Sequence, residues 1–184
     1  MPPLSTKLTF ALGSDEKSRK LPSKIVVSQS QNETLDHVLL KALAFVIFHG
    51  DRLRLEVDVE LPGVPFVPDL IKLALDGRPE LWIECGEVSL HKLEKLTLKL
   101  NDTDIWVVKK SAGEVTKTVE LARRNIKRLG RLRLLTFDPG FIPELLALAS
   151  GSNSLHLVKL VPGEMMQIVF NDLWFETALR VTAP

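Results

Sequence analysis

The chain has 184 residues, of which 45% are apolar and 26% are charged, and its formal net charge is +1. These values are typical of one globular domain, so we expect a single domain over residues 1–184. The near-zero net charge argues against a globally basic coat for nucleic acids or an acidic tail, so any charge signal must be local.

Cysteine content and hydropathy indicate the compartment. Cys85 is the only cysteine, which excludes an intramolecular disulfide and a metal site made of cysteines alone. The first seven residues, MPPLSTK, lack the charged leader and apolar stretch of a secretory signal. The longest apolar run, Val38–Phe48, is interrupted by Lys41 and is shorter than the ~20 residues that cross a bilayer. We therefore expect a cytoplasmic protein that does not enter membranes.

The first elements are a hairpin and a helix. Alternating apolar residues at 8–12 and an apolar run at 25–27 predict two short antiparallel strands. Ser30 and Glu33 match a capping box, in which a hydroxyl and a carboxylate satisfy free N–H groups at a helix start. The sequence therefore predicts a helix from this point to about His49.

A strand, a loop and a short helix are expected next. Leu53–Leu61 alternates strictly between apolar and polar residues, which predicts a strand with one buried face. Pro62–Pro68 is a proline-rich loop. A short helix is then expected over Asp69–Asp76, with Asp69 as its N-cap.

The centre of the chain alternates between strand and helix periodicity. We expect strands over 80–85, 104–108 and 132–137, and helices over 88–100 and 114–129. Such a pattern predicts right-handed crossovers between parallel strands. A helix over 143–150 and strands near 155–161, 166–170 and 173–181 complete the chain. The predicted fold class is α/β (α+β), with a mixed central sheet flanked by helices.

Chemistry can be sought among carboxylates, because phosphate loops, nucleophile elbows and zinc-ligand spacings are absent from the sequence. Asp69 follows a proline-rich loop, and Glu84 ends the 80–85 strand, at the edge where α/β sheets place ligands. Two converging carboxylates suit Mg²⁺. The alternative is that Asp69 caps a helix and Glu84 is a surface residue at a strand end; the pattern alone favours this alternative.

Three segments carry a family resemblance: ETLDHVLLKALAF at 33–45, PDL at 68–70 and ELWIECG at 80–86. Their order and spacing resemble the YaeQ family, small bacterial proteins with a variant PD-(D/E)XK nuclease fold. The similarity is clearest over residues 33–150. It implies a nuclease-like core within the mixed sheet.

The resemblance also implies roles for individual residues. Asp69 and Glu84 look like the two acidic residues of the nuclease motif, and Glu33 like the acidic residue of the first helix. The carbonyl of Cys85 would complete the ligands of a magnesium ion. Such an ion polarises the scissile phosphate and lowers the pKa of a bound water.

This sequence departs from the nuclease motif at Gly86, where the motif has a lysine. Lys92, Lys95 and Lys99 share one face of the following helix and could supply the charge. Lys95 is our first choice because YaeQ proteins usually carry a lysine there, and we expect its ammonium to reach the pocket of Glu33, Asp69 and Glu84. The alternative is a solvated lysine face. His37, where the family usually has arginine, is a further departure that affects substrate contacts.

A local basic cluster lies on and after the predicted 114–129 helix. Its members are Arg123, Arg124, Lys127, Arg128, Arg131 and Arg133. Release of counterions from phosphates would make such a cluster a sequence-independent contact for nucleic acid. A solvated helix face explains the same residues equally well.

Two functions of different classes follow. One is a magnesium-dependent phosphodiesterase or nuclease acting on nucleic acid, with Asp69, Glu84 and Lys95 as catalytic residues. The other is a non-catalytic module of the same fold that binds nucleic acid or a protein partner. Retention of the acidic residues favours the first and Gly86 favours the second. A fold resemblance alone does not establish activity.

Overall fold

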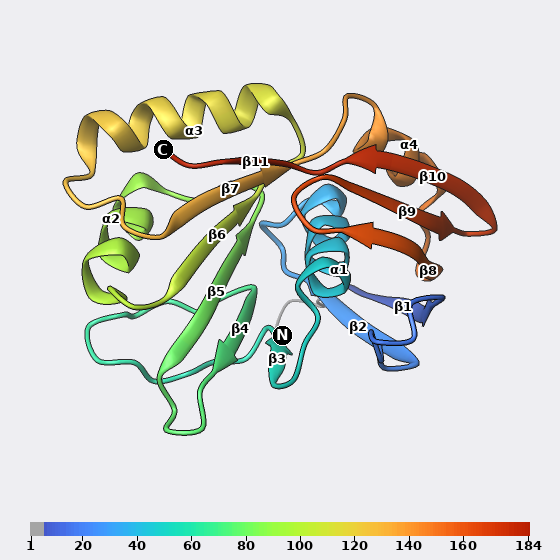
Figure 1. Ribbon diagram of the computed structural model, residues 1–184, viewed down its shortest axis with the longest axis horizontal. Helices are drawn as coiled ribbons and strands as arrows, with labels where there is room; N and C mark the ends of the chain where they lie inside the picture. The colour runs from blue at the N-terminus through green and yellow to red at the C-terminus, as the bar shows by residue number, and fades with distance from the viewer. Residues whose placement is uncertain (1–5) are drawn as a thin grey trace.

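The computed structural model describes residues 6–184, so most of the N-terminal segment considered above, residues 1–5, lies outside it. Two mixed sheets are present, where a single central sheet was expected (Figure 1). The first has the order β10-β9-β8-β1-β2 and the second β11-β7-β6-β5-β4-β3. The first sheet consists of β1 (Thr6–Ser14), β2 (Lys24–Gln29), β8 (Ser152–Val161), β9 (Met165–Phe170) and β10 (Leu173–Ala178).

The second sheet contains the predicted β-α-β-α-β unit. Its strands are β3 (Leu53–Leu55), β4 (Leu70–Leu73), β5 (Pro79–Cys85), β6 (Asp104–Val108), β7 (Leu132–Thr136) and β11 (Arg180–Thr182). The strands β5, β6 and β7 are parallel neighbours, connected by α2 (Leu90–Lys99) and α3 (Ala112–Asn125). This confirms the predicted parallel segment. β4 pairs in antiparallel fashion with β5 and with the edge strand β3, and the other edge strand, β11, pairs in antiparallel fashion with β7.

The first sheet is assembled from both ends of the chain. β1 and β2 form the predicted antiparallel hairpin. β1 also pairs in parallel with β8, at a register that joins Thr9 to Ser152. The strand expected over 173–181 is divided, since β10 pairs with β9 while β11 crosses to the second sheet. Local periodicity carries no information about such pairings between distant segments.

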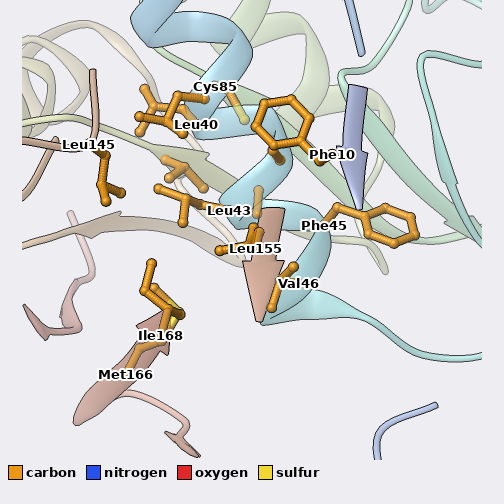
Figure 2. Packing of buried hydrophobic residues seen from close by; sticks show 14 of the residues in the cluster. Phe10, Leu40, Leu43, Phe45, Val46, Cys85, Leu145, Leu155, Met166 and Ile168 are labelled. Atoms are coloured by element: carbon orange, nitrogen blue, oxygen red, sulfur yellow. The ribbon is translucent and has the colours of Figure 1, made fainter. Parts of the chain in front are cut away.

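Helix α1 (Leu35–Phe48) lies between the two sheets, and α4 (Phe141–Leu148) packs into the same core. All nine residues from Val38 to Val46 are buried, because α1 has a neighbour on every side. Figure 2 shows Leu40 and Leu43 of α1 among residues from both sheets, such as Phe10, Cys85 and Leu155. No helix within residues 6–184 is long and apolar enough to cross a membrane.

A second core covers the other face of the second sheet. It is formed by apolar side chains of β5, β6 and β7 packed under α2 and α3, namely Trp82, Ile105, Val107, Leu134, Leu93, Leu96, Val115, Val119 and Ala122. The sheet is therefore buried on both faces. This is the situation in which parallel strands read as continuous apolar runs rather than as an alternation.

The prediction of a helix over Asp69–Asp76 is wrong, because residues 70–73 form the strand β4. Leu70 belongs to the core around α1 and Ile71 to the core under α2, so consecutive side chains point to opposite faces of the sheet. A short apolar run is compatible with either a helix or a strand. Pairing with β5 makes this segment a strand. Asp69 is consequently not a helix N-cap.

Several other boundaries differ from the prediction. The strand expected over Leu53–Leu61 ends at Leu55, since Glu56 has a positive φ of 51° and turns the chain away. Helix α1 begins at Leu35, although the Ser30 N–H does donate to the Glu33 carboxylate. α3 ends at Asn125 rather than at residue 129, and α4 begins at residue 141 rather than 143.

Candidate functional site

The candidate site lies where β5 ends and β4 begins. The two strands are antiparallel, and the pairing of Leu70 with Ile83 places Asp69 beside the last residues of β5. The backbone N–H of Cys85 donates to Asp69 Oδ2 over 2.7 Å. This hydrogen bond orients the Asp69 carboxylate at the carboxyl edge of the parallel strands.

Two side chains join Asp69: Glu33, which lies just before α1, and His37, which lies in its first turn. His37 Nε2 lies 3.2 Å from both carboxylate oxygens of Asp69 and 3.7 Å from Oε1 of Glu33. One ligand atom from each residue lies within 4.8 Å of the other two. Burial opposes protonation of His37, but the hydrogen bond to Asp69 and the nearby negative charges outweigh it. The pKa of His37 is therefore above its ordinary value.

Glu84 occupies an adjoining, more enclosed position. The residue is 5% exposed, and Oε1 accepts a hydrogen bond from Trp82 Nε1 over 2.7 Å. Lys92 Nζ lies 2.7 Å from the same oxygen. Burial raises the pKa of Glu84 to about 7; the charge of Asp69 adds to this effect and Lys92 opposes it. Glu84 is not part of the three-residue group formed by Glu33, His37 and Asp69.

The lysine in contact with Glu84 is Lys92, not Lys95. Lys92 stands in the first turn of α2, which directly follows the end of β5, whereas Lys95 is about one turn further along. Within residues 6–184, Lys95 forms no ion pair. Spacing on a helix placed Lys92 and Lys95 on one face but did not indicate which side chain contacts Glu84. The role predicted for Lys95 remains a prediction.

Lys41 is a site residue that we did not predict. It is 1% exposed, and its ammonium lies 3.0 Å from Glu33 Oε2, 2.5 Å from Glu56 Oε1 and 3.0 Å from the carbonyl oxygen of Ser28. Burial opposes both charges, yet this hydrogen bonding leaves the pKa of Lys41 above its ordinary value and that of Glu33 below. The Glu56 N–H in turn donates to the Asp69 carbonyl oxygen over 2.8 Å. The feature of the sequence that could have indicated this role is a single lysine within an otherwise apolar helix segment.

The structure gives a physical reason for glycine at position 86. Gly86 has a positive φ of 67°, and a Cβ atom there would lie 3.3 Å from Nδ1 of His37. The His37 imidazole thus stands against the position from which the motif lysine would project. Both residues line a cavity of about 280 Å³, together with Asp36, Glu87, and Lys110.

The basic cluster does not join this site. Arg123 and Arg124 lie in the last turn of α3, and Lys127 and Arg128 follow the helix; all four are exposed. α3 starts at the carboxyl edge of β6 and returns to the opposite edge of the sheet. A helix of 14 residues is about 20 Å long, so the cluster and the carboxylates are separated by roughly this distance.

Comparison with known proteins gives the family. The sequence model described as "YaeQ protein" matches residues 7–169. The chain belongs to the YaeQ family. The predicted family and mixed α+β fold are thereby confirmed. A search of curated proteins finds no significant match.

Two solved YaeQ structures have the same fold. The YaeQ protein from Xanthomonas axonopodis pv. citri superimposes with a TM-score of 0.70 at 21% identity, covering 98% of this chain and 100% of that chain. The YaeQ protein from Pseudomonas syringae gives 0.74 at 15% identity, covering 98% and 97%. At such identities the similarity establishes the fold of this YaeQ chain and not its activity.

Proposed function

We propose that the carboxyl edge of β5 is a divalent-metal-dependent phosphodiesterase centre acting on nucleic acid. The observation that carries this proposal is the convergence of Glu33, His37 and Asp69 within 4.8 Å, next to the buried pair of Glu84 and Lys92. These residues come from the segment around the start of α1, the position before β4, the end of β5 and the first turn of α2, so the fold rather than local sequence assembles them. Resemblance to the nuclease-fold variant indicates the reaction class.

The donor set fits a divalent cation. Two carboxylates provide the oxygen ligands that magnesium and manganese prefer, and the carbonyl of Cys85 is a further proposed ligand. The imidazole of His37 suits manganese better than magnesium. Such an ion would polarise a phosphoryl oxygen and lower the pKa of a bound water.

The chain's own groups orient and charge the centre. The Cys85 N–H holds Asp69, and Lys41 holds Glu33. Glu84, with a pKa of about 7, can accept a proton from an attacking water near neutral pH. Lys92 supplies the positive charge that the nuclease motif provides with a lysine at the position occupied here by Gly86. In this proposal Lys92 takes the part first assigned to Lys95.

Cleavage of a mixed panel of DNA and RNA with Mg²⁺ or Mn²⁺ tests the proposal. We expect wild-type cleavage, and loss of it in Asp69→Asn and in Glu84→Ala, with chromatographically matched preparations. Equal activity of the wild type and Glu84→Ala would mean a contaminating nuclease and would overturn the proposal.

A second candidate is a non-catalytic module that binds nucleic acid or a protein. The observation that favours it is that Glu84 Oε1 already accepts the Trp82 N–H and the Lys92 ammonium. Binding of an oligonucleotide with no cleavage under any metal would support this candidate. Cleavage that depends on Glu84 would reject it.

A further inference from the structure

Glu56 is connected to both candidate acidic ligands of the three-residue group. It directly follows β3, and its backbone N–H donates to the carbonyl oxygen of Asp69 over 2.8 Å. This bond continues the antiparallel pairing of β3 with β4. Glu56 Oε1 also lies 2.5 Å from the ammonium of Lys41, which in turn lies 3.0 Å from Glu33 Oε2. One residue outside the group therefore reaches Asp69 through its backbone and Glu33 through a buried lysine.

The backbone of Glu56 has a conformation that glutamate rarely adopts. Its φ is 51°, in the left-handed region that glycine enters without steric cost. A residue with a Cβ atom is held there at a cost of about 1–2 kcal/mol. Such strained positions cluster at functional sites, where the surrounding contacts maintain them. Glycine would serve better if the chain only had to turn here, so the side-chain contacts of Glu56 are the feature to be explained.

The Glu56 carboxylate fixes the position of Lys41. Its Oε2 accepts the N–H of Ser28 in β2 over 3.1 Å, while Oε1 contacts the ammonium. The ammonium also donates to the carbonyl oxygen of Ser28 over 3.0 Å and to Glu33. These three contacts match the three N–H donors of a lysine. Lys41 is therefore held between two carboxylates, in a position that is 1% exposed.

This arrangement determines how Glu33 faces the candidate metal centre. Glu33 Oε2 accepts the Ser30 N–H over 3.1 Å and the Lys41 ammonium. Oε1 takes part in neither contact and lies 3.7 Å from Nε2 of His37. One oxygen is thus anchored, and the other is directed toward His37 and Asp69. Carboxylates that bind metals are commonly oriented by hydrogen bonds of this kind from residues outside the ligand set.

We propose that Glu56 is a positioning residue for the candidate metal centre. Its carboxylate shares the charge of Lys41, so this lysine can anchor one oxygen of Glu33 without neutralising the whole carboxylate. Without Glu56, the ammonium would be balanced mainly by Glu33, which would then attract a cation less strongly. The inference rests on the metal centre of the proposed function, but it does not depend on the reaction that the centre catalyses.

Mn²⁺ binding, measured by calorimetry in the absence of nucleic acid, tests this role. Glu56→Gln keeps the shape of the side chain and removes its charge. Glu56→Gly removes the side chain and relieves the positive φ; since the side chain is 25% exposed, water can fill the space. We expect each variant to weaken Mn²⁺ binding about tenfold, as is usual when a group that orients a metal ligand is lost.

Glu60→Gln is the matched control, because it removes the same charge from an exposed position in the following loop. It should change Mn²⁺ affinity less than twofold. A second measurement separates positioning from chemistry in a protein that cleaves nucleic acid. Both Glu56 variants should then need about tenfold more Mn²⁺ for half-maximal cleavage, while the rate at saturating Mn²⁺ stays within threefold of the wild type.

Thermal melts first establish that the variants are folded. If Glu56→Gln is not, Glu56→Gly decides, because glycine adopts this backbone conformation without strain. Mn²⁺ affinity within twofold of the wild type in Glu56→Gly would show that the residue only turns the chain, and would overturn the role while leaving the metal centre intact. A wild type that binds no Mn²⁺ would overturn both. Weakened Mn²⁺ binding in the variants of a protein that cleaves nothing would reject the phosphodiesterase and retain the role of Glu56.

Discussion

The ammonium of Lys92 lies 2.7 Å from Oε1 of Glu84 and 3.4 Å from the carbonyl oxygen of Val67. The same ammonium lies 5.5 Å from the centre of the Phe66 ring. One side chain of α2 therefore contacts both the end of β5 and the proline-rich loop that precedes Asp69. Because this loop leads into β4, the contact joins the two segments that carry the candidate acidic residues.

Lys92→Ala should reduce cleavage on the order of 10²-fold, as expected when a group that orients or activates water is lost. Lys95→Ala is the matched comparison, since it removes the same group one turn along the same helix and leaves Glu84 paired. We expect Lys95→Ala to reduce the cleavage rate less than threefold. Initial rates of cleavage at saturating metal are measured for both variants. A large loss in Lys95→Ala with little change in Lys92→Ala would restore Lys95 as the functional lysine.

Glu84→Gln should change the pH dependence of stability. Because the pKa of Glu84 rises from 4.5 to about 7 on folding, the folded state binds more protons than the unfolded state in this window. Wild-type stability should therefore fall as pH rises from 4.5 to 7. Relative to Glu84→Gln, the wild type should lose roughly 2–3 kcal/mol of its free energy of unfolding over this pH range. Urea denaturation of metal-free protein at pH 5 and pH 8 measures it.

Glu80→Gln provides the control for that series, because Glu80 lies on the same strand but is solvent-exposed and paired with Lys72. Its difference from the wild type should be small at both pH values. If Glu84→Gln and the wild type lose stability in parallel between pH 5 and pH 8, the buried carboxyl does not titrate in this range.

His37→Ala should discriminate between metals. Loss of the imidazole should weaken Mn²⁺ binding at least tenfold and Mg²⁺ binding much less, because nitrogen ligands contribute little to magnesium affinity. Since Asp69 raises the pKa of His37, wild-type Mn²⁺ affinity should also fall as pH drops below that value. Calorimetry measures the affinity for each metal and its dependence on pH. The control is His156→Ala, which removes an imidazole that pairs with Asp15. Unchanged Mn²⁺ affinity would remove His37 from the ligand set.

Lys41→Met should destabilise the fold by about 3–5 kcal/mol, because it leaves Glu33 and Glu56 without their buried partner. Adding Glu56→Gln should recover part of the loss. Exposed Lys159→Met should stay within about 0.5 kcal/mol of the wild type. Urea denaturation at pH 7 is the measurement. A Lys41→Met protein as stable as the wild type would show that the three charges contribute nothing net to folding.

Much of the second sheet could be predicted from sequence, because β5, α2, β6, α3 and β7 follow one another along the chain. In such a unit the period of each segment is a local property, and the short connections leave few arrangements. The same reasoning found the hairpin of β1 and β2. It failed at residues 69–76, where two adjacent side chains enter different cores and only the partner strand β5 selects a strand.

The candidate site divides in the same way. The carboxylates Asp69 and Glu84 were found because each follows a recognisable pattern next to its own element, and the comparison with YaeQ sequences gave their order. His37 and Lys41 were not assigned to the site, and Lys92 was passed over for Lys95, because their contacts are made between different elements of the fold: His37 with Asp69, Lys41 with Glu56 and Lys92 with Glu84. Residue type and period are written in the sequence; which charged atoms come within hydrogen-bonding distance depends on how α1 and α2 pack against β5.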